Sequence, residues 1–153
     1  MQAEYMEAAL SLAREAAAEG EVPVGAVIVS DGRIISTGRN RREKSQNALT
    51  HAEIEAINGA CKAIGSWRLI DCDMYVTLEP CPMCAGALIN SRIKRLFFGA
   101  YDSKAGCCGS VTDIFSMPFN HKVKVKGGIM EKECSAELTE FFSKLRQLKK
   151  GNI

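Results

Sequence analysis

The chain has 153 residues, of which 46% are hydrophobic and 25% are charged. This length suits one domain with its own hydrophobic core, and we expect residues 1–153 to form a single domain. The composition excludes collagen-like and wholly disordered proteins. Without a run of about twenty apolar residues or a secretory signal, the chain is expected to be soluble and cytoplasmic, with no membrane partner.

The formal net charge is only +2, but the charges are distributed unevenly. Acidic residues dominate positions 1–21, whereas basic residues gather in segments 39–44, 92–104 and 144–150. Such basic segments allow an anionic partner, such as a nucleic acid. The alternative is that they form ordinary solvated surface, and charge alone leaves both interpretations open.

The chain contains seven cysteines, spread over about half of its length. An odd number of cysteines in a chain without an extracellular signal argues against a disulfide framework. We therefore expect reduced thiols, some of them buried and some bound to a metal ion.

The first elements are a helix and a hairpin. Apolar residues at helical spacing predict a helix over residues 2–19. A continuous run of small and β-branched residues predicts a buried strand over 24–29. The turn signal Asp31-Gly32 then returns the chain as a second strand over 33–39. Residues 40–50 are polar and irregular, and are predicted to be a loop.

Helices and strands alternate in the rest of the chain. Thr50 is predicted to open a helix that ends at Gly65. Further strands are predicted at 73–78, 94–100 and around Val123 and Val125, with helices at 83–89 and 131–149. The long irregular stretch 101–120 is of a kind that usually serves function. This order predicts a three-layer α/β/α fold around a mixed, about five-stranded sheet.

Two short strings carry the residues with the most chemistry: His51-Ala52-Glu53, and Pro80-Cys81-Pro82-Met83-Cys84. Each has a simpler interpretation when taken alone. Thr50 and Glu53 fit a capping box that satisfies the first amides of a helix. The two cysteines fit a redox pair or half of a structural zinc site. Both strings stand at predicted helix starts, so both can face one end of the same sheet.

Together the two strings supply one imidazole nitrogen and two sulfur atoms. A zinc ion held by His51, Cys81 and Cys84 would have three protein ligands, and such sites usually keep a water in the fourth position and are catalytic. Glu53 lies near enough to accept and return a proton. A structural zinc site would instead need a fourth donor, for which the candidates are Cys61, Cys72, Cys107, Cys108, Cys134 and His121.

The pattern H-x-E followed by P-C-x-x-C is the signature of zinc-dependent nucleobase deaminases. From about residue 4 to residue 150 the chain resembles the bacterial tRNA-specific adenosine deaminases, whose fold is cytidine-deaminase-like. Besides the two strings, the resemblance rests on Glu21 to Ala26, Arg39-Asn40, Ser66 to Leu69, Tyr75 to Ala87, Gly99-Ala100, Gly109-Ser110, Phe119 to His121 and Phe141-Phe142.

The resemblance implies hydrolysis of adenosine to inosine at the wobble position of a tRNA anticodon stem-loop, with release of ammonia. It also implies a homodimer with one Zn²⁺ per subunit, in which Glu53 is the catalytic residue and His51, Cys81 and Cys84 hold the metal. The residues that it places along the RNA are Asn40, Arg42, Asp102, Lys104, Asn120, Phe142 and Arg146.

Some assignments stay open at this point. Asn40 is also compatible with a loop-capping role, and Asp102 with an ion pair to Lys104. Glu79 is expected either to tune the metal site or to cap the following helix. Of the two phenylalanines Phe141 and Phe142, at least one is expected in the core, because both lie on the apolar stripe of the last helix.

Three other functions compete with deamination of RNA. A guanine or cytidine deaminase acting on a free base or nucleoside would carry the same strings. The basic loops and the Phe141-Phe142 to Lys150 ending favour a larger, anionic substrate. A thiol redox protein would not need the matching His51-Ala52-Glu53 string. A protein that binds RNA without turnover would not need Glu53.

Overall fold

The computed structural model describes residues 2–151, which form five α-helices, one 3₁₀ helix and five strands. In chain order these are α1 (Gln2–Ala18), β1 (Gly25–Ser30), β2 (Arg33–Arg39), α2 (Arg42–Ser45), α3 (Ala52–Ile64), β3 (Cys72–Leu78), α4 (Pro82–Asn90), β4 (Arg95–Ala100), η1 (Ile114–Ser116), β5 (Lys124–Lys126) and α5 (Glu131–Gly151).

The five strands form one mixed sheet in the order β2-β1-β3-β4-β5. Strand β1 runs antiparallel to both of its neighbours, and β3, β4 and β5 run parallel to one another. The hairpin predicted at Asp31-Gly32 joins β1 and β2, and it makes the sheet mixed. The predicted number of strands and the mixed character of the sheet are both confirmed.

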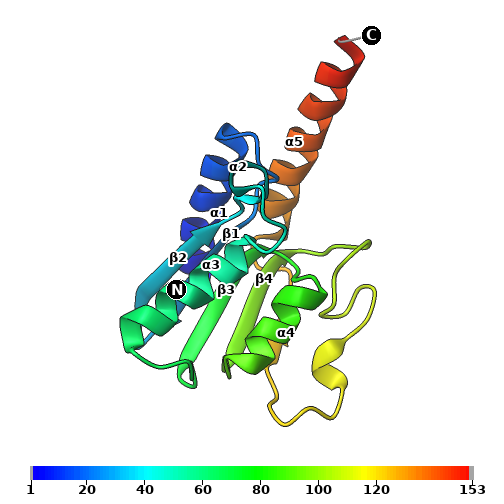
Figure 1. Ribbon diagram of the computed structural model, residues 1–153. Coiled ribbons are helices and arrows are strands. Elements are labelled where there is room, and N and C mark those ends of the chain that lie inside the picture. Colours follow the sequence, from blue (N-terminus) through cyan, green and yellow to red (C-terminus); the bar gives the residue numbers. More distant parts are fainter. Residues whose placement is uncertain (1, 152–153) are drawn as a thin grey trace.

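Alternate residues of β1 face two different layers of helices, as the two-residue period of a strand requires. Ala26 and Ile28 belong to the core cluster formed with α3 and α4. Val27 and Val29 belong to the cluster formed with α1 and the first turns of α5. Figure 1 shows α3 and α4 on one side of the sheet and α1 on the other. The predicted three-layer α/β/α fold is therefore confirmed.

The ends of several elements differ from the prediction. The short helix α2 interrupts the segment that was expected to be a loop. Helix α3 begins at Ala52, with His51 as its N-cap, and no side chain caps it. Thr50 does not complete a capping box, because its hydroxyl group donates a hydrogen bond to the carbonyl oxygen of Asn47 instead (2.8 Å). The capping-box interpretation is wrong.

Helix α5 is less embedded in the core than its apolar stripe predicted. Cys134 is its buried residue, Phe141 is half-buried, and Phe142 is 40% exposed, so the expectation that one phenylalanine lies in the core is wrong. The reason is geometric: the first turns of α5 pack against β4, and the rest of the helix extends past the sheet (Figure 1). Within residues 2–151, no helix combines the length and the apolar character needed to cross a membrane.

Three strands end at the same edge of the sheet. Gly25 at the start of β1 pairs with Arg39 at the end of β2. On the other side of β1, Leu78 at the end of β3 pairs with Ala100 at the end of β4. The segments that follow β2, β3 and β4 therefore meet at this edge. In α/β sheets this is the usual place for a ligand site.

Candidate active site

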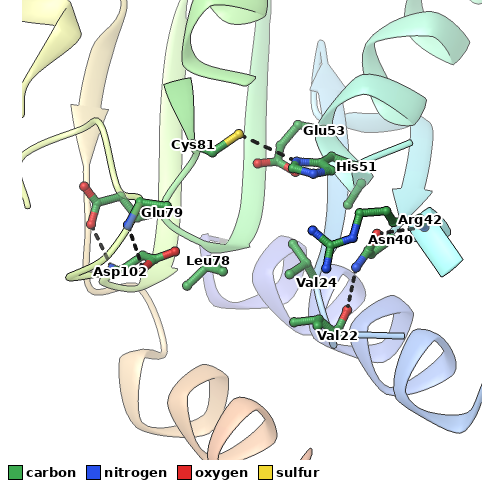
Figure 2. Close-up of a pocket in the computed structure, with 12 residues that line it drawn as sticks. Val22, Val24, Asn40, Arg42, His51, Glu53, Leu78, Glu79, Cys81 and Asp102 are labelled. Atoms are coloured by element: carbon green, nitrogen blue, oxygen red, sulfur yellow. Dashed lines mark hydrogen bonds between the residues drawn. The ribbon is translucent and has the colours of Figure 1, made fainter. Parts of the chain in front are cut away.

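A cavity of about 200 Å³ lies where these segments meet (Figure 2). The segment before β1 and the segments after β2, β3 and β4 each contribute part of its wall. The residues that line it are Val22, Val24, Asn40, Arg42, His51, Ala52, Glu53, Leu78, Glu79, Cys81, Asp102 and Ala105. The cavity therefore combines the two strings that the sequence analysis singled out with the long segment after β4.

The starts of two helices bring the three metal donors together. His51 is the N-cap of α3 and Cys81 is the N-cap of α4, with Cys84 one turn further along α4. The Nδ1 atom of His51 lies 3.6 Å from Sγ of Cys81 and 3.5 Å from Sγ of Cys84. One ligand atom from each residue lies within 4.8 Å of the others. This is the spacing of side chains that can share one metal ion.

A fourth protein donor is not found in the part of the chain that the structure describes. Within residues 2–151, the group of His, Cys, Asp and Glu side chains that can hold one ion comprises the same three residues. Of the earlier candidates, His121 donates a hydrogen bond from Nε2 to the carbonyl oxygen of Ile93, beside the start of β4 at the opposite edge of the sheet. The donor set is therefore of the open type that catalytic zinc sites use.

The close approach of α3 to β2 helps to place His51. A Cβ atom at Gly38 would lie 2.2 Å from the carbonyl oxygen of Ala52 and 2.7 Å from the amide nitrogen of Ala56. Any side chain there would push the start of α3 away from the sheet. The glycine at the end of β2 thus allows the first turn of α3 to reach the edge where Cys81 lies.

Hydrogen bonds among the three donors place the negative charge on Cys81. Hydrogen bonds, first from Cys84 and then from His51, lower the pKa of Cys81 to about 4. The pKa of Cys84 is raised, mainly because it shares that hydrogen bond and because it is buried. The hydrogen bond with Cys81 likewise raises the pKa of His51. A thiolate is the form of cysteine that binds metal ions, and here it is the stable form of Cys81.

Glu53 is the second residue of α3 and is only 4% exposed. Figure 2 shows its carboxyl group beside the imidazole of His51, facing Cys81. Burial raises the pKa of Glu53 to about 7. A carboxyl group with a pKa near neutrality can both accept and donate a proton at physiological pH.

The residues expected to contact the substrate are placed at different distances from this centre. Asn40, Arg42 and Asp102 line the cavity itself. Lys104 and Phe142 line a neighbouring groove of about 380 Å³, which shares Val22, Leu78 and Asp102 with the cavity. Arg146 is exposed and lies one turn beyond Phe142 on α5.

Asn120 is not brought to the cavity. It is exposed, and the next residue, His121, is bonded to the carbonyl oxygen of Ile93 near the amino end of β4. That end of the strand is at the opposite edge of the sheet from Ala100, which leads into the cavity wall. Its expected contact with RNA stays a prediction from the resemblance.

Asn40 has a structural role as well as its place in the cavity wall. Its Nδ2 atom donates a hydrogen bond to the carbonyl oxygen of Val22 (3.2 Å), and its Oδ1 atom accepts one from the amide of Arg42 (3.1 Å). Both bonds are visible in Figure 2. The side chain thus ties the segment before β1 to the segment after β2, which was the alternative left open for it.

Most of the basic residues after β2 are neutralised within the chain. Arg39 pairs with Glu15 of α1 and with Glu19 directly after that helix, and Lys44 also pairs with Glu19. Arg41 pairs with Glu55 of α3. Among the ion pairs of residues 2–151, Arg42 takes no part. The basic segment therefore offers one free guanidinium group, and it lies in the cavity wall.

The role of Glu21, a buried carboxylate next to Val22 of the cavity wall, was not predicted from the sequence. Glu21 is 1% exposed, and its oxygens accept hydrogen bonds from the amides of Glu43 (2.9 Å) and Lys44 (2.7 Å). It thereby anchors α2 and the segment that carries Arg42. The available signal was an acidic residue directly before the apolar run that leads into β1.

Comparisons with known proteins agree with the fold and show the family. The family model of the MafB19-like deaminases matches residues 1–146. A tRNA-specific adenosine deaminase of Bacillus subtilis is 48% identical over 148 residues, which are 96% of this chain and 92% of the relative. The chain belongs to the family of MafB19-like deaminases. A tRNA-specific adenosine deaminase of Haemophilus influenzae is also 48% identical, over 95% of this chain and 85% of the relative.

Solved structures similar to this deaminase include a tRNA deaminase and a guanine deaminase. A structure from work on A-to-I editing by tRNA:A34 deaminases at the wobble position of transfer RNA is 46% identical, with a TM-score of 0.86. It covers 88% of this chain and 99% of its own. A guanine deaminase from Nitrosomonas europaea shares the fold at 25% identity, with a TM-score of 0.76, over 91% of this chain and 83% of its own.

Proposed function

We propose that this deaminase converts adenosine to inosine at the wobble position of a tRNA anticodon stem-loop and releases ammonia. The observation that carries the proposal is the buried carboxyl group of Glu53 in one cavity with three converging metal donors. The substrate is supported by the relatives, because a tRNA-specific adenosine deaminase is 48% identical over 96% of this chain. The tRNA:A34 deaminase structure matches with a TM-score of 0.86, against 0.63 for a guanine deaminase from Bacillus subtilis that is 41% identical over 74% of this chain.

The cofactor that fits the site is Zn²⁺, one ion per subunit. An imidazole nitrogen and two thiols are donors that zinc accepts readily, and three protein ligands leave a position for water. Residues His51, Cys81 and Cys84 would hold the ion. When bound, it would lower the pKa of a water molecule and so supply the nucleophile of a hydrolysis.

Glu53 would move the protons of the reaction. Its carboxylate accepts a proton from the attacking water and passes it to N1 of the adenine ring, which makes C6 a better electrophile. It then takes a second proton from the hydroxyl group that has added to C6 and delivers it to the departing amino group, so that adenosine and water yield inosine and ammonia. The buried position of the carboxyl group keeps it from exchanging protons freely with bulk water.

The residues around the cavity would hold the RNA. Asn40, Arg42 and Asp102 line the place that the target base enters, and Lys104 and Phe142 line the adjoining groove. Basic side chains bind phosphates, and an exposed aromatic ring offers a stacking surface for an unpaired base. Arg146 would extend this path along α5. The proposed contact of Asn120 rests on the resemblance alone.

The decisive experiment offers the purified protein two classes of substrate. We expect inosine, measured by mass after nuclease digestion, in a synthetic anticodon stem-loop with adenosine at the wobble position. The deoxy version of the same stem-loop tests whether ribose matters. Faster release of ammonia from free guanine or cytidine than from the stem-loop would overturn the proposal in favour of a free-base or nucleoside deaminase.

We further propose that residues 1–153 act as a single deaminase domain, and that the protein works in the cytoplasm as a homodimer. The dimer follows from the resemblance, and its measurement is independent of activity. Light scattering after gel filtration is expected to give about twice the chain mass of 16.7 kDa. A mass equal to that of one chain would contradict the dimer without affecting the proposed reaction.

A further inference from the structure

Glu79 lies between the metal donors and the opposite wall of the cavity. It follows β3 directly, is 2% exposed, and precedes Cys81 by two residues. Its own amide donates a hydrogen bond to the carbonyl oxygen of Ala100 at the end of β4 (2.9 Å). The residue is thus fixed to both strands whose ends form the cavity.

The carboxylate of Glu79 binds the long segment after β4 rather than capping α4. Oε1 accepts a hydrogen bond from the amide of Asp102 (3.0 Å), and Oε2 accepts one each from the amides of Cys108 (3.0 Å) and Ser110 (3.1 Å). The hydroxyl group of Ser110 also donates to Oε1. Four donors from one segment therefore converge on a single buried carboxylate.

The segment is shaped around this carboxylate. A Cβ atom at Gly106 would lie 2.3 Å from Cδ of Glu79 and 2.5 Å from each of its oxygens. Only a glycine lets the backbone approach so closely without displacing the carboxyl group. Burial raises the pKa of Glu79, but the hydrogen bonds from Ser110, Asp102 and Cys108 outweigh it, so that the pKa lies below its ordinary value.

The segment whose amides bind Glu79 also forms part of the cavity wall. Asp102 lines the cavity, and its Oδ1 atom accepts hydrogen bonds from the amides of Lys104 (3.0 Å) and Ala105 (3.1 Å). Ala105 lines the same cavity. Figure 2 shows Glu79 linked to Asp102 on the side of the cavity that faces Arg42 and Asn40. Moving the carboxylate would therefore move the wall that faces the substrate.

We propose that Glu79 is a positioning residue that sets the distance between the metal ligand Cys81 and the cavity wall formed by Asp102 and Ala105. It acts on the fit of the substrate, and not on the affinity of the site for metal. The inference rests on the proposed function, because the substrate used to test it is the anticodon stem-loop.

The test is Glu79→Gln, which keeps the size of the side chain but turns one acceptor into an NH₂ group that opposes amide donors. A buried donor without a partner weakens the contact between residue 79 and the segment after β4, and the cavity wall then fits the substrate less well. We therefore expect KM to rise about 10- to 100-fold. We expect kcat to stay within about threefold and bound zinc to stay at about one ion per chain. Hydrogen exchange at the amides of Cys108 and Ser110 should accelerate at least about tenfold.

Two further variants separate positioning from simple loss of stability. Gly106→Ala leaves Glu79 intact but displaces its carboxylate, and is expected to raise KM in the same way even if the glutamine variant fails to fold. Asp113→Ala removes the cap that the Asp113 carboxylate provides to the amide of Phe115, in the same segment after β4. The backbone of Asp113 pairs with Cys108, but its side chain is not a partner of Glu79, so the four donors to Glu79 remain in place. The KM of this variant should stay within about twofold of the wild-type value.

The outcomes are distinct. An unchanged KM in both Glu79→Gln and Gly106→Ala would overturn the inference, as would loss of zinc together with a fall in kcat at constant KM. A comparable rise in KM for Asp113→Ala would also overturn it, because a general loosening of the segment after β4 would then be enough to explain the rise in KM. Failure of the wild-type protein to convert the stem-loop would instead refute the proposed function, and amide exchange would still show whether Glu79 holds the wall.

Discussion

His51 and Cys81 occupy the same position in two different helices: each is the N-cap residue, and neither uses its side chain to cap. The imidazole and the thiol are thereby free to turn toward one another, with Nδ1 3.6 Å from Sγ. The positive end of a helix dipole also favours the thiolate form of a cysteine. Two helix starts at one edge of the sheet thus deliver donors that are 30 residues apart in the chain.

Replacing His51 by Ala should remove one of three metal donors. We expect zinc content, measured by mass spectrometry after dialysis against a chelator, to fall from about one ion per chain to a small fraction. Because a ligand that binds only the folded state stabilises it, the melting temperature should fall as well. Cys61→Ser is the matched control, since Cys61 lies outside the metal cluster. Equal zinc in the His51 variant and the wild-type protein would contradict the proposed ligand set.

Replacing Glu53 by Gln should remove the proton carrier and keep the shape of the site. We expect the rate of inosine formation to fall about 10²- to 10⁴-fold, with zinc content and stem-loop binding retained. Glu55→Gln changes a neighbouring carboxylate of α3 that only pairs with Arg41 on the surface. Its activity should stay within a few-fold of wild type. Substantial activity in the Glu53 variant would disprove the assigned role.

Arg42→Ala should weaken RNA binding through loss of the free guanidinium group in the cavity wall. Removing one phosphate contact lowers the slope of log affinity against log salt by about one. The control is Arg41→Ala, because that guanidinium is already paired with Glu55 at 2.8 Å. Filter binding at several salt concentrations measures both variants. If the two variants show equal slopes, then Arg42 does not contact the RNA backbone.

The thiols of the core should resist alkylation in the folded protein. Burial raises the pKa of Cys134 to about 11, so that at pH 8 only about one molecule in a thousand carries its reactive thiolate. Raising the pH from 8 to 9 should increase the rate about tenfold, since the pKa lies above both values. Iodoacetamide labelling mapped by mass spectrometry measures this, with the guanidinium-unfolded chain as the control. Rapid labelling of Cys134 at pH 8 would show that the first turns of α5 detach readily from β4.

Local patterns in the sequence predicted most of the fold. The alternation of Ala26 to Val29 between two helix layers and the Asp31-Gly32 turn depend on neighbours a few residues away, so periodicity and turn chemistry suffice to read them. The pairing of His51 with Cys81 and Cys84 was predictable because both strings open helices, although they are distant in the chain.

The predictions that failed depend on where an element ends up in space. The apolar stripe of α5 indicated a buried phenylalanine, but the helix passes the edge of the sheet before Phe141 and Phe142, and Phe142 stays exposed. Thr50 matched a capping box, but the preceding turn takes its hydroxyl group. Both misses concern contacts that no local pattern encodes.

The sequence by itself predicted the class of fold, the three side chains that can share a metal ion and the carboxylate beside them, because the two strings combine donor residues with predicted helix starts. Only the tertiary structure decided which basic residues remain free and which carboxylates hold the cavity walls. Arg39 is neutralised by Glu15 and Glu19, Arg42 takes no part in an ion pair within residues 2–151, and Glu21 and Glu79 bind backbone amides of distant segments. Such partners are chosen by proximity in space, because charges and hydrogen bonds act over a few ångströms regardless of separation along the chain.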